Sequence, residues 1–288
     1  MRFDLYVPKN LNDLLRYLDK NRQATVIAGG TDLIPRIERR IARPKLLVDI
    51  SSLHELRHIE SQGDEIKLGA LTTISDLEES SALATRYEVF RQVSYKFGAP
   101  PIRNVGTVGG NVAASSSSED LIPVFLALDA SVQLASINGK RSLPLQKFLL
   151  GKRNVDLKPG ELITEISFRK MTKSSWCSFE KVGRRSSLII ALVSAAVYLD
   201  LDPKQMTITQ IRAAFNRVRG KIPERTHLTE ESLRGKHLND ETVNEGLGVL
   251  ESELMLTTDY RASADYRKRA AKICFERALA HCRAKIIG

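Results

Sequence analysis

Two short stretches of the chain place a Gly-Gly pair beside a threonine and a small polar side chain: AGGTD at residues 28–32 and TVGGN at residues 107–111. The first pair follows the apolar run 24–28 and precedes a helical pattern, so it lies where a strand meets a helix. Glycine permits positive φ and lets a ligand approach the main chain, because no Cβ intervenes. Successive exposed N–H groups form a concave site for phosphate. We therefore expect the two segments to hold the two phosphates of one dinucleotide.

Each Gly-Gly pair on its own also fits an ordinary tight turn. The sequence contains no GxGxxG after a strand and no GxxxxGK[ST]. These absences disfavour a Rossmann site and a P-loop site. The expected diphosphate site is therefore of another kind.

The pattern around the first pair predicts strands alternating with helices. We expect strands over 3–8, 24–28, 45–50 and 65–69, and helices over 11–18, 32–41, 74–80 and 84–97. Asn10 is the expected N-cap of the first helix, and Gly98 the expected C-cap of the last. Residues 99–120 are rich in Pro, Gly and Ser and predict a long loop. The apolar segments on both sides of it favour a packed, functional loop over a disordered one.

The second half of the chain predicts strands followed by helices. Segments 131–134, 161–168 and 178–182 are expected in one antiparallel sheet, with further strands at 189–201 and 211–216. From residue 230 onward the pattern is helical, ending in a long helix over 263–284. The best boundary lies at residues 170–175, so the second domain is predicted to be α+β.

Composition limits the possible functions. The 288 residues are 42% hydrophobic, enough for a core in each of two domains. No apolar run could span a bilayer and the N-terminus lacks a signal-peptide pattern, so a cytoplasmic protein is expected. Cys177, Cys274 and Cys282 form no CxxC pair, which excludes an all-cysteine iron-sulfur or zinc site in this chain. The five histidines lie outside both glycine pairs, so no covalent flavin link is expected there.

The chain is basic, with 44 Lys and Arg against 34 Asp and Glu and a net charge of +10. The excess is diffuse, and its clusters carry no interleaved aromatic residues of the kind that bind single strands. An anionic cofactor or an acidic protein partner is favoured over nucleic acid. A non-enzymatic basic interaction module stays open as an alternative.

Three stretches together resemble the FAD-binding medium subunit of the molybdenum hydroxylases, the family of xanthine dehydrogenase and aerobic carbon monoxide dehydrogenase. They are VIAGGTDL at 26–33, IRNVGTVGGNVAASSSSEDLIPVFLALDA at 102–130 and DYRASADYRKRAA at 259–271. The resemblance covers essentially the whole chain. It implies a two-lobed FAD-binding domain of the PCMH type at 1–172, with lobes at about 1–58 and 59–172. An α+β C-terminal domain with an antiparallel sheet and a helical bundle follows at 173–288.

The resemblance also implies a site for non-covalent FAD. Both glycine segments would wrap the diphosphate and ribityl chain, while Phe97 and Ile163 would lie near the flavin. The implied residues are Val26, Ile27, Ala28, Gly29, Gly30, Thr31, Asp32, Leu33, Phe97, Thr107, Val108, Gly109, Gly110, Asn111, Asp120, Ile163 and Lys181. No catalytic residue and no metal ligand are expected here, because flavin performs the chemistry.

The implied partners are a large chain with molybdopterin and a small chain with two [2Fe-2S] clusters, assembled as a dimer of heterotrimers. Electrons would pass from the clusters through FAD to NAD, oxygen or a quinone. A free-standing FAD-dependent oxidoreductase is the alternative. It would need its own acid or base near the flavin, and the sequence offers no obvious candidate.

Overall fold

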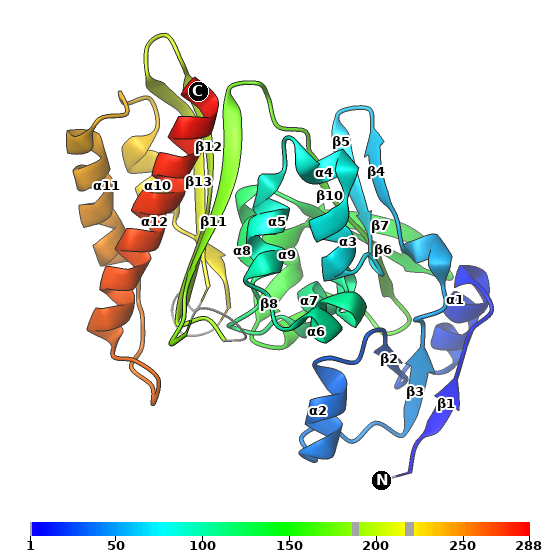
Figure 1. Ribbon diagram of the computed structural model, residues 1–288. Helices are drawn as coiled ribbons and strands as arrows, with labels where there is room; N and C mark the ends of the chain where they lie inside the picture. Colours follow the sequence, from blue (N-terminus) through cyan, green and yellow to red (C-terminus); the bar gives the residue numbers. More distant parts are fainter. Residues whose placement is uncertain (1, 186–189, 217–221) are drawn as a thin grey trace.

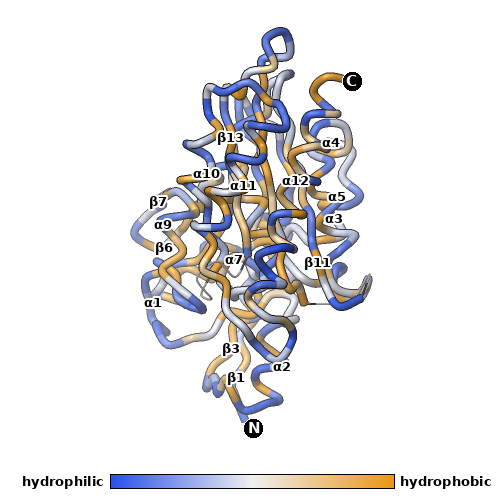
Figure 2. The backbone as a smooth tube through the Cα atoms, turned by 90° about the vertical axis from the view of Figure 1, so that its left-hand side faces the viewer, coloured by the Kyte–Doolittle hydropathy of each residue, from blue (hydrophilic) through white to orange (hydrophobic). Residues whose placement is uncertain are grey.

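The computed structural model describes residues 2–185, 190–216 and 222–288. Figure 1 shows three bodies in chain order: a first lobe in blue, a second lobe in cyan and green, and a C-terminal domain in yellow and red. Figure 2, turned by 90°, also places the two termini at opposite ends of the molecule. Across the described ranges, no helix combines the length and apolar content that crossing a membrane requires.

The first lobe is a three-stranded parallel sheet with order β1-β3-β2. Its elements are β1 Asp4–Tyr6, α1 Leu11–Lys20, β2 Thr25–Ile27, α2 Leu33–Glu38 and β3 Leu46–Asp49. The Asn10 side chain caps α1 by accepting the N–H of Asp13 at 2.9 Å, as predicted. The buried side chains of Leu14 and Leu18 pack with Val48 and Ile50, which fixes α1 against one face of the sheet.

The second lobe is a five-stranded antiparallel sheet with order β4-β5-β10-β6-β7. Its strands are β4 Ile59–Gln62, β5 Glu65–Gly69, β6 Ser131–Ser136, β7 Gly139–Pro144 and β10 Leu162–Arg169. A 3-10 turn η1 His54–Leu56 precedes it, and β8 Leu149–Gly151 pairs with β9 Asn154–Val155. The helices are α3 Ile74–Glu79, α4 Ser81–Ala84, α5 Glu88–Tyr95, α6 Pro100–Val105, α7 Val108–Ala114, α8 Leu121–Ala127 and α9 Leu145–Phe148. Phe90, Phe125 and Phe168 fill the core between sheet and helices.

In its described residues, the C-terminal domain is an antiparallel sheet with three helices. It contains β11 Ser175–Val182, β12 Val193–Asp202, β13 Thr207–Phe215, β14 Glu224–Arg225, α10 His227–Leu233, α11 Asp240–Glu253 and α12 Ala264–Ile287. Successive strand residues point to opposite faces. Val197 and Leu199 accordingly pack on the helices, whereas Ala196 and Tyr198 belong to the core of the second lobe. Figure 1 shows α11 and α12 on the outer face of this sheet.

Helix α8 is enclosed between the second lobe and this sheet, and all seven of its residues are buried. The C-terminal domain holds both ends of it. Lys181 Nζ on β11 donates to Asp120 Oδ2 at 2.5 Å, immediately before the helix begins. Arg212 Nε on β13 donates to the carbonyl of Ala127 at 2.6 Å. This cation lies at the negative end of the helix dipole, where positive charge is stabilising. The two domains are therefore joined through charged contacts at α8.

The predicted α+β class is confirmed. Most predicted elements begin and end within two or three residues of their predicted bounds. Residues 99–120 are not one long loop, because Pro100 starts α6 and Thr107 caps α7. The helix predicted over 84–97 is shorter in the structure, because α4 ends at Ala84 and α5 begins only at Glu88 and ends at Tyr95. Segment 178–182 pairs with β12 rather than with β10, so it lies in the second sheet. Ile189, the predicted start of a strand, is outside the described residues.

The predicted boundary between residues 172 and 173 falls in the connection from β10 to β11. That connection carries the chain from one sheet to the other. Placement of the boundary at this point stays a prediction.

We predict that Asp120→Ala lowers the free energy of unfolding by about 3–5 kcal/mol, because the Lys181 ammonium is left buried without its carboxylate. The double variant Asp120→Ala, Lys181→Met removes both charges and should recover most of the loss. Denaturant unfolding of the single and double variants measures the coupling. Additive losses in the double variant would show that the two side chains do not stabilise each other.

Candidate functional site

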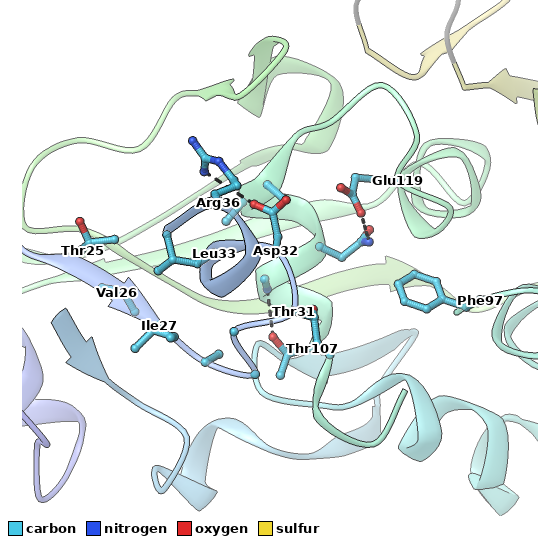
Figure 3. A pocket seen from close by; sticks show the side chains of 18 residues that line it. Thr25, Val26, Ile27, Thr31, Asp32, Leu33, Arg36, Phe97, Thr107 and Glu119 are labelled. Atoms are coloured by element: carbon cyan, nitrogen blue, oxygen red, sulfur yellow. Dashed lines mark hydrogen bonds and ion pairs between the residues drawn. The ribbon is translucent and has the colours of Figure 1, made fainter. Parts of the chain in front are cut away.

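The two glycine segments, residues 26–33 and 107–111, meet in one hollow of about 250 Å³. Segment 26–33 belongs to the first lobe, and Thr107, Gly110 and Asn111 come from the second. Figure 3 shows Thr31, Asp32 and Thr107 converging on this hollow, with Phe97 and Glu119 at one side. The predicted convergence of the two segments is therefore present in the fold.

Gly29 and Gly30 of the first segment have different structural roles. A Cβ on Gly29 would stand 1.7 Å from the carbonyl oxygen of Val105, so the first lobe lies against the end of α6 with no room for a side chain. Gly30 has a φ of +69°, a conformation that L side chains rarely adopt. The chain thus turns sharply from β2 into α2 while it touches the second lobe.

Main-chain donors of the first segment are available to a ligand. Within the described chain, the N–H groups of residues 29–32 have no hydrogen-bond acceptor. Half-buried backbone N–H groups are nearly always paired, with protein, water or a ligand. Four consecutive free donors just before a helix suit an anion.

The second segment differs from the expectation, because the backbone N–H groups of residues 108–111 already have acceptors in the protein. The N–H groups of Val108 and Gly109 bond to the carbonyls of Thr72 and Ala70 at 2.9 and 2.8 Å. Thr107 caps α7: its Oγ1 accepts the N–H of Gly110 at 3.1 Å, and its carbonyl accepts that of Asn111. The prediction that both segments present free N–H groups is wrong for this one. Its glycines instead form a wall without side chains.

Each glycine of that wall faces different surroundings. A Cβ on Gly109 would stand 2.9 Å from the carbonyl oxygen of Ala70, so this residue packs against the chain at the end of β5. A Cβ on Gly110 would meet only Thr107 Oγ1, at 2.8 Å, and otherwise extend into free space. Val108 is fully buried in the core and lines neither cavity described here. Gly110 is thus the position where bare backbone faces the hollow.

Three carboxyl groups lie at or behind the wall of the hollow. Asp32 forms a two-point ion pair with Arg153, at 2.7 and 2.8 Å, and lies 3.6 Å from Arg36. Arg153 follows β8 in the second lobe, so this pair bridges the two lobes. Glu119 accepts a hydrogen bond from the Asn111 amide. Part of the Glu119 side chain reaches the surface, but its carboxyl is enclosed, and this burial raises its pKa to about 8.

Asp120 and Lys181 lie behind the lining rather than in it. Lys181 Nζ donates to Asp120 Oδ2 and also to the carbonyl of Lys96 at 2.9 Å, beside Phe97. Burial raises the pKa of Asp120, and the Lys181 ammonium opposes that rise. The other oxygen, Asp120 Oδ1, is buried with no partner among the described residues, as is Asn111 Oδ1. Two buried acceptors therefore lack donors.

A second cavity of about 120 Å³ continues from the first. It is lined mainly by apolar side chains, including Leu71, Leu162 and Ile163, and it shares Val26, Thr107 and Gly110 with the first hollow. Phe97 lines only the first cavity and Ile163 only the second. The two cavities share residues of both glycine segments, and the free backbone donors of residues 29–32 line the first cavity, which suits a dinucleotide with a diphosphate bridge.

Sequence reasoning missed three charged residues of the site: Arg36, Glu119 and Arg153. Arg36 lies four residues after Asp32, a helical spacing that could have indicated their pairing. Glu119 sits beside the predicted Asp120. Arg153 is 121 positions from Asp32, so no local pattern signals that contact. Among the residues that the structure describes, no three His, Cys, Asp or Glu side chains gather as a metal site.

Comparison with known proteins identifies the family. Residues 1–168 match the family described as FAD binding domain in molybdopterin dehydrogenase, and residues 178–282 match the CO dehydrogenase flavoprotein C-terminal domain. The chain is 30% identical to the nicotinate dehydrogenase FAD-subunit of Eubacterium barkeri, over 96% of this chain and 94% of that one. It is 29% identical to the glyceraldehyde dehydrogenase medium chain of Sulfolobus acidocaldarius, over 92% of each.

A solved structure of carbon monoxide dehydrogenase from Hydrogenophaga pseudoflava contains a chain of the same fold. It superposes with a TM-score of 0.93 at 28% identity and covers 99% of this chain and 98% of that one. The match extends over both domains, as the family matches do. This chain therefore belongs to the FAD-binding flavoprotein subunits of the molybdopterin dehydrogenases.

Proposed function

We propose that this chain is the electron-transfer subunit of a heterotrimeric molybdenum hydroxylase, with FAD bound non-covalently between its two N-terminal lobes. The observation that carries the proposal is the set of free N–H groups at residues 29–32, which line the same hollow as Gly110. A diphosphate supplies the acceptors that these donors lack. When bound, FAD exchanges electrons one or two at a time.

The other residues around the cleft support the same ligand. The first segment, Val26 to Leu33, and the second, Thr107 to Asn111, enclose the diphosphate and ribityl chain. Hydroxyl groups of the ribityl chain are donors of the kind that the buried Asn111 Oδ1 lacks. Phe97 lines the first cavity and Ile163 lines the second. Asp120 and Lys181 brace the wall next to Phe97.

The partners follow from the place of this chain among its relatives. Several of them are named medium chains or FAD subunits of dehydrogenases, for example the carbon monoxide dehydrogenase medium chain of Afipia carboxidovorans. We propose a large chain with molybdopterin and a small chain with [2Fe-2S] clusters as partners, assembled as a dimer of heterotrimers. FAD would pass electrons to NAD, oxygen or a quinone. The net charge of +10 favours acidic partner surfaces.

Purification of the tagged chain from its native host tests the assembly. We expect a flavin absorption spectrum, molybdenum and iron in the same fraction, and two co-purifying chains identified by mass spectrometry. Raising the salt concentration should weaken the association if charge complementarity contributes. Flavin without co-purifying chains would indicate a free-standing flavoprotein, and a protein without flavin would contradict the proposal.

We predict that Gly110→Val lowers FAD affinity by at least about tenfold, which corresponds to 1.4 kcal/mol. The branched side chain would extend into the hollow, where only Thr107 Oγ1 is near. The matched control is Gly248→Val, another helical glycine whose Cβ would meet nothing within 4 Å. Equilibrium dialysis of FAD measures the effect, and circular dichroism verifies that both variants fold. Equal affinity in the two variants would remove Gly110 from the site.

A further inference from the structure

The three carboxyl groups around the hollow differ in whether a positively charged side chain pairs with them. Asp32 has the two-point contact with Arg153, and Asp120 has the ammonium of Lys181. Glu119 lines the hollow but has no cation within ion-pair distance among the described residues. Its hydrogen-bond donors are neutral groups, the amide of Asn111 and the side chain of Ser116. Glu119 is thus the one acidic side chain of the lining with no positive partner of its own.

Charged groups reach Glu119 from several elements. Asp32, just before α2, and the adjacent Asp120, just before α8, both raise the pKa of Glu119. Arg153, after β8, and a hydrogen bond with Ser116 lower it, but by less than burial raises it. Arg36 and Lys181 are engaged with Asp32 and Asp120. The surroundings therefore favour the neutral acid even without a ligand.

The ligand makes this preference stronger. The diphosphate of FAD brings further negative charge into an enclosed hollow, where like charges repel more than in water. A neutral carboxylic acid avoids the repulsion and offers an O–H donor, whereas a carboxylate can only accept. One buried acceptor at the hollow, Asn111 Oδ1, already lacks a donor.

We propose that Glu119 binds FAD as a neutral carboxylic acid whose O–H donates a hydrogen bond to the diphosphate or the ribityl chain, so that FAD is retained more weakly as Glu119 ionises. The inference rests on the proposed FAD site. It makes Glu119 a cofactor-binding residue whose charge controls FAD affinity, because the same side chain would repel the ligand once deprotonated.

The direction of the pH dependence follows from linkage. Below a pKa of about 8 the free chain already has neutral Glu119, and FAD affinity should not change with pH. Above it, the chain must take up a proton in order to bind FAD. The dissociation constant should then rise by about tenfold for each pH unit, as expected for coupling to one proton.

The test uses the full chain stripped of flavin. FAD is titrated by flavin fluorescence from about pH 6.5 to about pH 9.5, a range around the pKa of Glu119. Wild type should show constant affinity followed by the rise, and Glu119→Gln, which keeps shape and cannot ionise, should show no rise. Glu60→Gln, on the exposed edge strand β4, is the control and should behave like wild type.

A second measurement reports the proton itself. Calorimetric titration with FAD at high pH, in two buffers of different ionisation enthalpy, counts the protons taken up. We expect about one for wild type and about none for Glu119→Gln. This readout does not depend on how strongly the substitution changes affinity.

The outcomes separate the two proposals. FAD binding with no proton uptake in wild type, or with the same pH profile in Glu119→Gln, would overturn the role of Glu119 and leave the FAD site intact. Absence of FAD binding by wild type at every pH would overturn the proposed function, and the inference with it.

Discussion

The contact of Gly29 with the Val105 carbonyl is the constraint on which the site depends. A Cβ at residue 29 has no space there, so only glycine lets the first lobe approach the end of α6. This approach brings the free donors of residues 29–32 opposite Gly110. The Asp32–Arg153 ion pair also connects the two lobes. The cleft is thus formed by close backbone contact between two lobes rather than by a single loop.

The site combines backbone without side chains and a buried ion pair. The first glycine segment offers donors, whereas the second is hydrogen-bonded within its own lobe and offers only shape. Behind this wall, Asp120 and Lys181 neutralise each other in a place closed to water. A flavin in the cleft would meet a wall whose N–H groups at residues 108–111 already have acceptors in the protein.

Local signals in the sequence predicted the strand-turn-helix around Gly29-Gly30, the Asn10 cap and the order of strands and helices, because each depends on residues close together in the chain. The convergence of the two segments followed from the resemblance to a family and from shared chemistry. The occupied N–H groups of Val108 and Gly109 could not be predicted, since their acceptors, Thr72 and Ala70, are nearly forty positions away. The same holds for Arg153, whose partner Asp32 lies in another lobe.

The placement of Lys181 has a consequence for the independence of the two domains. This lysine belongs to the C-terminal sheet, yet it neutralises a carboxylate beside the cleft between the two lobes. Phe179, Ala196 and Tyr198 of that sheet likewise complete the core of the second lobe. An N-terminal fragment produced alone would carry an uncompensated charge and an uncovered apolar face. Covalent continuity with the last hundred or so residues is therefore part of how the nucleotide-binding half remains folded.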